Sequence, residues 1–242
     1  TVSETYFVDK YMFDRYAFPI VSILTDPAYL FDDLIGIYVP GELSKLNMPG
    51  QKWQEDQSNF FQRGRKWERP AYIQMFDQSG RLIFDSNAGI RIHGSWTRLL
   101  NQKSLRLYAR DEYSSDGYFE YEFFPELNNR FNDNSVNTFT SLILRNSGQD
   151  WRNNKERWHS TMFKDAFSQS LLEHTLLDIQ GYQPVIVFLS GEYWGIHNLR
   201  TRYDEHYFES YYGIEPKDLV LLETGLGSLN IGAQEDVQDY QD

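Results

Sequence analysis

Apolar and polar positions alternate through the middle of the chain. Isoleucine alternates with polar residues over 90–93, and leucine does the same over 105–108. A period of two predicts strands with one buried and one wet face. This alternation, together with shorter continuous apolar runs, predicts strands over residues 71–76, 89–94, 104–110, 139–145, 185–189 and 195–201.

Shorter segments complete the expected architecture. Short strands are predicted over 20–24, 35–39 and 219–222, and a short helix over 205–212 that ends at Gly213. Helical spacing over 156–177 predicts a longer helix that packs on the sheet through Trp158, Met162, Phe163, Ala166, Phe167 and Leu171,. The fold class we expect is α+β: one domain with a mainly antiparallel sheet and a packed helix.

Residues 42–68 follow neither period, so we expect a long surface excursion there,. Its aromatic residues would suit a platform that holds a protein or a glycan at a surface. Alternatively, the excursion packs on its own aromatic side chains. The residues concerned are Trp53, Phe60, Phe61 and Trp67.

Composition narrows the possible functions. The net charge of −12 argues against a surface that coats nucleic acid, although a local basic pocket is compatible with it,. The absence of cysteine excludes disulfides and thiol chemistry,. No apolar run approaches the ~20 residues that span a bilayer. The five histidines have no metal-ligand spacing, and no G-x-S-x-G motif is present,.

The strongest candidate for chemistry lies between two predicted strands. The segment from Gly89 to Arg98 ends a strand at Gly94 and continues into a loop with hydroxyl and arginine side chains. Lys103 has the parity of Leu105, so it should point to the inward face of the next strand. A buried lysine is costly unless it meets an anion, which favours a phosphate site formed with the loop. The alternative, in which Lys103 reaches water at the mouth of the strand, stays open.

Asp165, on the predicted long helix, is a candidate partner for Lys103. A helix acid that pairs with a strand lysine is the arrangement found in protein kinases. The spacing alone favours the other interpretation, an exposed Lys164–Asp165 pair on a solvated helix face.

Several ordered motifs resemble the CotH family, spore-coat-type kinases with an atypical protein-kinase fold. They are Phe18-Pro-Ile-Val-Ser-Ile-Leu-Thr-Asp26, Gly36-Ile-Tyr-Val39, Glu68-Arg-Pro-Ala71, Gly89-Ile-Arg-Ile-His-Gly-Ser-Trp-Thr-Arg98, Lys103-Ser-Leu-Arg-Leu-Tyr108, Leu144-Arg-Asn146, Leu189-Ser-Gly-Glu-Tyr-Trp-Gly-Ile196 and Asn198-Leu-Arg-Thr-Arg-Tyr-Asp204. The resemblance implies a secreted or cell-surface protein that binds ATP with Mg or Mn and phosphorylates Ser/Thr-rich protein. It implies nucleotide-binding roles for Ser95, Thr97, Arg98, Lys103 and Asp165, and we expect Arg106 to lie near them as a further nucleotide-binding residue.

The sequence departs from the family pattern in two ways. The family often has Glu where this chain has Thr201, and Arg where it has Lys164. Its catalytic Asp…Asn segment and a later metal-binding Asp lie downstream of a region like 236–242. We therefore expect residues 1–242 to form a single CotH-kinase-like domain that is incomplete at its C-terminus. The catalytic residues stay unknown, and no metal ligand is assigned.

Three functions follow as expectations. The first is the nucleotide-cradling part of an atypical protein kinase, which alone would bind ATP weakly and show no turnover. The second is a cell-surface module that binds protein or glycan on a kinase-like scaffold. The third is a structural coat component. None of them involves nucleic acid or a membrane-spanning segment.

Overall fold

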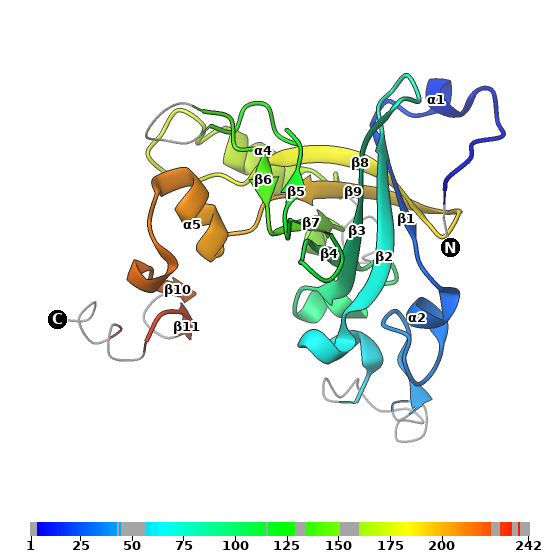
Figure 1. Cartoon of the computed structure of the whole chain (residues 1–242), viewed down its shortest axis with the longest axis horizontal. Helices are drawn as coiled ribbons and strands as arrows, with labels where there is room; N and C mark the ends of the chain where they lie inside the picture. Colours follow the sequence, from blue (N-terminus) through cyan, green and yellow to red (C-terminus); the bar gives the residue numbers. More distant parts are fainter. Residues whose placement is uncertain are drawn as a thin grey trace.

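Seven strands close into a barrel (Figure 1). The computed structural model describes residues 4–42, 44, 57–114, 116–128, 134–150, 160–223, 228–233 and 237. Around the barrel the order is β1-β2-β3-β4-β7-β9-β8, and only the closing pair, β1 with β8, is parallel. The strands are β1 (Ile20–Leu24), β2 (Arg69–Phe76), β3 (Leu82–His93), β4 (Ser104–Tyr108), β7 (Ser141–Arg145), β8 (Tyr182–Leu189) and β9 (Glu192–Arg200). The expected α+β class with a mainly antiparallel sheet is confirmed.

The alternation seen in the sequence separates the inside of the barrel from its outside. Ile92 pairs with Leu105, which pairs in turn with Leu144, and all three side chains are buried. Arg91 and Arg106 pair in the intervening row and therefore lie on the outer face,. The barrel interior is thus apolar, while the adjacent outer surface carries positive charge.

The strand predicted over 35–39 is wrong. After α2 (Pro27–Phe31) the chain turns back on that helix, and the amides of Gly36, Ile37 and Tyr38 donate to carbonyls of residues 29–32. A Cβ at Gly36 would lie 2.5 Å from the carbonyl oxygen of Asp32. This close approach, which the apolar pattern does not reveal, replaces a strand with a compact turn.

The long helix predicted over 156–177 is also wrong in its extent and its packing. The helix α4 covers Lys164–Ser170, and residues 151–159, including Trp158, lie outside the described part. Phe163, Phe167 and Leu171 are exposed, whereas Ala166 is buried. Polar contacts hold α4 on the barrel instead, because two arginines of β7 and β9 bind Asp165.

The helix predicted over 205–212 is confirmed as α5 (Glu205–Tyr212). Asp204 caps its start by accepting from the amide of Tyr207, and Gly213 ends it with a φ of 62°,. A small hairpin of β10 (Leu221–Glu223) and β11 (Ser228–Ile231) follows and lies below α5 (Figure 1).

Short elements complete the described chain: α1 (Met12–Arg15), β5 (Phe119–Glu120), β6 (Thr138–Phe139) and five 3₁₀ turns, η1 (Asn59–Phe61), η2 (Arg65–Trp67), η3 (Trp96–Leu99), η4 (Gly148–Asp150) and η5 (Pro216–Asp218). Among the described residues, no helix has the length and apolar character needed to cross a membrane.

Candidate anion-binding site

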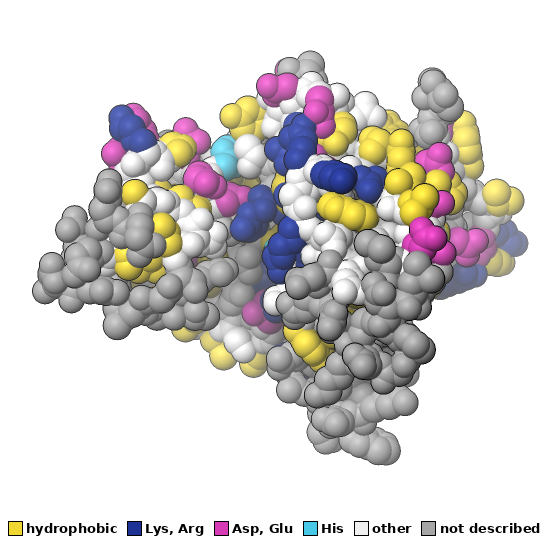
Figure 2. All heavy atoms as spheres, turned by 90° about the horizontal axis from the view of Figure 1, so that it is seen from below, with side chains coloured by type: hydrophobic (Ala, Val, Ile, Leu, Met, Phe, Trp, Pro, Cys, Tyr) yellow, Lys and Arg dark blue, Asp and Glu magenta, His cyan; other side chains and the backbone are white. Residues whose placement is uncertain are grey.

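A hollow lined by arginines lies where the outer face of the barrel meets β11. It encloses about 560 Å³, and Figure 2 shows Lys and Arg side chains gathered across the middle of this side of the molecule. We call it the basic pocket. Its described lining consists of Gln62, Arg63, Gly64, Arg91, Ile92, His93, Gly94, Ser95, Arg98, Arg106, Tyr108, Arg202 and Asn230.

The barrel register builds the floor of the basic pocket. Arg91 on β3 and Arg106 on β4 are cross-strand partners, and both guanidinium groups lie over the ring of Tyr108, 4.2 and 4.6 Å from its centroid. Arg110 lies 4.7 Å from the same ring. Cations this close to a tyrosine face are stabilised by its quadrupole, so Tyr108 helps to hold three like charges together.

Glu68 holds two of these three arginines, Arg110 and Arg91, in place. Its carboxylate accepts from Nε and a terminal nitrogen of Arg110 at 2.8 and 2.9 Å, and it lies 3.6 Å from Nε of Arg91. A Cβ at Gly89 would lie 2.4 Å from a carboxylate oxygen of Glu68. Glycine at this position therefore leaves room for the acid.

The remaining arginines differ in how far they are already bonded. Arg106 donates to Asp204 at 3.0 Å and to the Ser141 hydroxyl at 2.8 Å. Among the described residues, Arg63 makes only a long hydrogen bond of 3.4 Å to the carbonyl of Gly94, and Arg202 makes no hydrogen bond or ion pair. Arg63 and Arg202 are thus the cations most available to a ligand.

His93 lies among these arginines, and both burial and their charges lower its pKa. Burial lowers the pKa of His93 to about 4, and the charges of Arg202, Arg98, Arg145 and Arg63 act in the same direction. The arginine charges thus add to the effect of burial, and three of these four arginines line the basic pocket,.

Two cations that the sequence predicts to contact phosphate donate hydrogen bonds to backbone carbonyls of the loop and its neighbours. The guanidinium of Arg98 donates to the carbonyls of Gly94, Phe60 and Gln62 at 2.6, 2.8 and 3.1 Å. Nζ of Lys103 donates to the carbonyls of Arg98 and Leu100 at 2.7 and 2.8 Å.

The surroundings of Lys103 are closed. Its Nζ lies 4.3 Å from the centroid of the Phe60 ring, its side chain is almost fully buried, and burial lowers its pKa to about 8. The sequence predicts that the Lys103 side chain points inward, and its buried position agrees with that prediction. The partners of Nζ are backbone carbonyls of the loop and not the carboxylate of Asp165.

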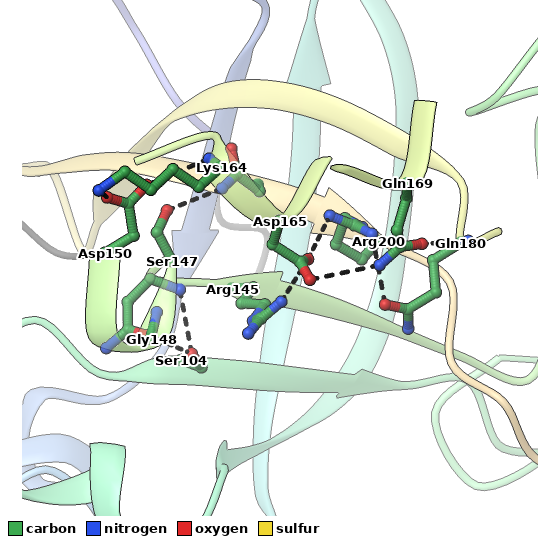
Figure 3. A network of polar contacts seen from close by, with 12 residues as sticks. Ser104, Arg145, Ser147, Gly148, Asp150, Lys164, Asp165, Gln169, Gln180 and Arg200 are labelled. Atoms are coloured by element: carbon green, nitrogen blue, oxygen red, sulfur yellow. Dashed lines mark hydrogen bonds and ion pairs between the residues drawn. The ribbon is translucent and has the colours of Figure 1, made fainter. Parts of the chain in front are cut away.

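Asp165 belongs to a separate polar network beside α4. Its carboxylate accepts from Arg145 and, at 2.9 Å, from Arg200, and Figure 3 shows both guanidinium groups pointing at it. Lys164 lies 3.4 Å from Asp150. The network fastens α4 to β7 and β9, and neither a Lys103–Asp165 nor a Lys164–Asp165 pair forms.

The six residues predicted to bind nucleotide therefore divide into two groups. Ser95, Arg98 and Arg106 line the basic pocket, whereas Thr97, Lys103 and Asp165 are not among its lining residues. Thr201, the departure from the family pattern, is buried and accepts from the amide of Gly181 at 3.0 Å. It lies next in sequence to Arg202 and does not itself line the basic pocket.

The sequence reasoning missed Arg63, Arg91, His93, Tyr108 and Arg202 as pocket residues. Arg91 was recognisable, because it shares the outer parity of Arg106 across a predicted hairpin. The other arginines, Arg63 and Arg202, come from connections whose position depends on the closed barrel, which local periodicity does not specify.

The chemistry of the lining fits an anion and not a metal ion. Five arginines line the basic pocket, and its described lining includes neither Asp nor Glu. Nowhere in the described part of the chain do three or more His, Asp or Glu side chains gather as metal ligands. The Mg or Mn implied by the resemblance therefore has no fitting donor set among these residues.

A comparison with models of protein families identifies the family of the chain. The family model described as CotH kinase protein matches residues 90–242. The chain belongs to this family. The match includes His93, Ser95, Arg98, Arg106 and Arg202 of the basic pocket, while Arg63 precedes it. No curated protein matches the chain.

The aromatic platform considered for residues 42–68 is only partly described. Phe60 and Phe61 are buried, and Phe60 underlies Lys103, so these two rings are not available to a glycan. Trp67 is partly buried, and the guanidinium of Arg69 lies 5.3 Å from its ring. Trp53 lies outside the described residues.

Proposed function

We propose that this CotH-family chain is the nucleotide-cradling part of an atypical protein kinase. In this proposal the basic pocket receives the phosphates of ATP, and the whole protein phosphorylates Ser/Thr-rich protein outside the cell or at its surface. The observation that carries the proposal is the convergence of five arginines without a lining carboxylate in an otherwise acidic protein.

The basic pocket suits phosphate for two physical reasons. Guanidinium groups donate paired hydrogen bonds that match phosphate oxygens, and charge-assisted bonds of this kind are about twice as strong as neutral ones. Arg91 and Arg106 are held by existing contacts, so little side-chain freedom is lost when an anion binds between them and the available Arg202,.

The loop of residues 94–100 has a supporting role in this proposal. Lys103 and Arg98 bind its carbonyls, which fixes the position of Ser95 at the edge of the basic pocket. Lys103 then acts as a positioning residue, whereas Arg63, Arg91, Arg106 and Arg202 are the candidates for direct contact with phosphate.

ATP binding tests the proposal. We expect Arg202→Ala to weaken binding of ATP about tenfold at low salt, since one charge-assisted contact is lost. A matched control is Arg81→Ala, because Arg81 is an exposed arginine at the β2–β3 turn that pairs with Asp77. Titration calorimetry measures both variants against the wild type. Equal ATP affinity in all three proteins would contradict the assignment of the basic pocket.

A further inference from the structure

We infer that the basic pocket recognises a phosphate chain in itself, with arginine side chains supplying the charge that neutralises it. Neither the nucleoside nor a divalent cation is then required for binding. This inference rests on the proposed function, because it concerns the same pocket, and it names the ligand class: chains of several phosphates, either free or as the tail of a nucleotide.

The distribution of the arginines supports a chain of phosphates over a single phosphate. The four candidates for direct contact come from separate parts of the sequence: Arg63 from the η1–η2 connection, Arg91 from β3, Arg106 from β4 and Arg202 from the segment after β9. Donors arranged around a cavity of about 560 Å³ offer several positions for anionic groups,. One phosphate would satisfy only part of this set.

The charges of the basic pocket also determine which counter-ion fits there. A divalent cation bound with the phosphates would lie among guanidinium groups that repel it, and no described lining residue offers it a carboxylate,. Burial is the main cause of the low pKa of His93, and the surrounding arginine charges lower it further. Arginine therefore takes the place that a metal ion holds in many phosphate sites.

The described lining offers little to a purine base. Its larger apolar side chains are Ile92 and Tyr108. Ile92 is buried, and the ring of Tyr108 is surrounded by three guanidinium groups at 4.2–4.7 Å. A base usually binds in an apolar slot, so we assign most of the binding free energy to the phosphates.

Titration calorimetry on the 242-residue chain at low salt tests the inference. The ligands are sodium tripolyphosphate with EDTA, ATP with EDTA, ATP with Mg²⁺, and AMP with EDTA. We expect tripolyphosphate and ATP to bind within about threefold of one another in EDTA, and AMP to bind at least about tenfold more weakly. Added Mg²⁺ should weaken ATP binding or leave it unchanged, since it neutralises the phosphates before they meet the arginines.

Variants connect this pattern to the basic pocket. Arg63→Ala and Arg202→Ala should each weaken tripolyphosphate and ATP by a similar factor, whereas Arg81→Ala should leave both affinities unchanged. Arg202→Lys retains the charge and should recover part of the loss. Unfolding midpoints equal to that of the wild type show that weaker binding does not come from misfolding, and variants that unfold early are replaced by Arg202→Gln.

The possible outcomes separate the two claims. ATP binding that depends on Mg²⁺, or AMP binding as tight as that of ATP, overturns the inference and leaves the proposed nucleotide cradle standing. Failure of both ATP and tripolyphosphate to bind under every condition overturns the cradle and the inference together.

Discussion

At the scale of single residues, the sequence pattern predicts where the Lys103 side chain points but not what it contacts. The sequence placed its side chain on the inward face of a strand, and the structure agrees. A buried ammonium needs partners, and the loop carbonyls of Arg98 and Leu100 supply them where an anion was expected,. The alternation of apolar and polar positions predicts which way a side chain points, but it does not identify the groups to which that side chain bonds.

Replacing Lys103 by Met should lower the free energy of unfolding by about 1–3 kcal/mol. Methionine preserves the apolar stem over Phe60 but leaves the two carbonyls without their donor,. Urea unfolding followed by circular dichroism measures the change. Lys217→Met, at an exposed side chain beside Glu215, serves as the control and should stay within about 0.5 kcal/mol of the wild type,.

The cost of Lys103→Met should also depend on pH. The pKa of Lys103 falls from 10.5 in the unfolded chain to about 8 in the folded protein. Between these values the unfolded state binds more protons, so the wild type gains stability as pH rises from about 8 to 10.5. The difference between wild type and Lys103→Met should therefore grow over this window, and a difference that shrinks would show that Lys103 is stabilised as an ammonium.

His93 leads to a second prediction about pH. Its pKa of about 4 in the free protein should rise when phosphates enter the basic pocket, since they offset the surrounding arginine charges,. A pKa higher in the bound state means that protons are taken up on binding, and that wild-type affinity rises as pH falls. Tripolyphosphate titrations from pH 7 to 5 should show a steeper rise for the wild type than for His93→Gln, and parallel curves would contradict this role.

At the scale of elements, strands were better predicted than the long helix, for a physical reason. The barrel strands were predicted from alternation of apolar and polar positions or from short continuous apolar runs, and a sequence carries both signals locally. The spacing of Phe163, Phe167 and Leu171 is equally regular, yet these side chains are exposed. Helix α4 is held by ion pairs from Asp165 to Arg145 in β7 and Arg200 in β9. Because these partners are far from α4 in the sequence, no local periodicity predicts them.

The packing of α4 can be tested by comparing two substitutions. Asp165→Asn removes the charge that binds Arg145 and the buried Arg200, and should destabilise the fold by about 1–2 kcal/mol, less than a fully buried pair because Asp165 is partly exposed,. Phe167→Ser, on the exposed face, should change stability by less than about 0.5 kcal/mol,. Chemical denaturation measures both variants. If Phe167→Ser lowers the free energy of unfolding more than Asp165→Asn does, the apolar packing predicted from the sequence is correct and this account of α4 is wrong.

At the scale of the whole molecule, closure of the barrel creates the candidate site. The parallel pairing of β1 with β8 brings together strands that are far apart in the sequence, and the outer face beside β3 and β4 then meets Arg63, Arg202 and the β10–β11 hairpin. The sequence grouped Ser95, Arg98 and Arg106 as candidates from adjacent motifs, and these three residues do line the basic pocket. Arg63 and Arg202 could not be predicted, because they approach the basic pocket only through this tertiary arrangement.

A crystal structure of the chain with ATP tests the central claim most directly. The account predicts phosphate oxygens within hydrogen-bond distance of Arg63 and Arg202 in the basic pocket, with Nζ of Lys103 still bonded to the carbonyls of Arg98 and Leu100. Phosphates bound to Lys103 with those two bonds broken, or bound at another surface of the barrel, would contradict it.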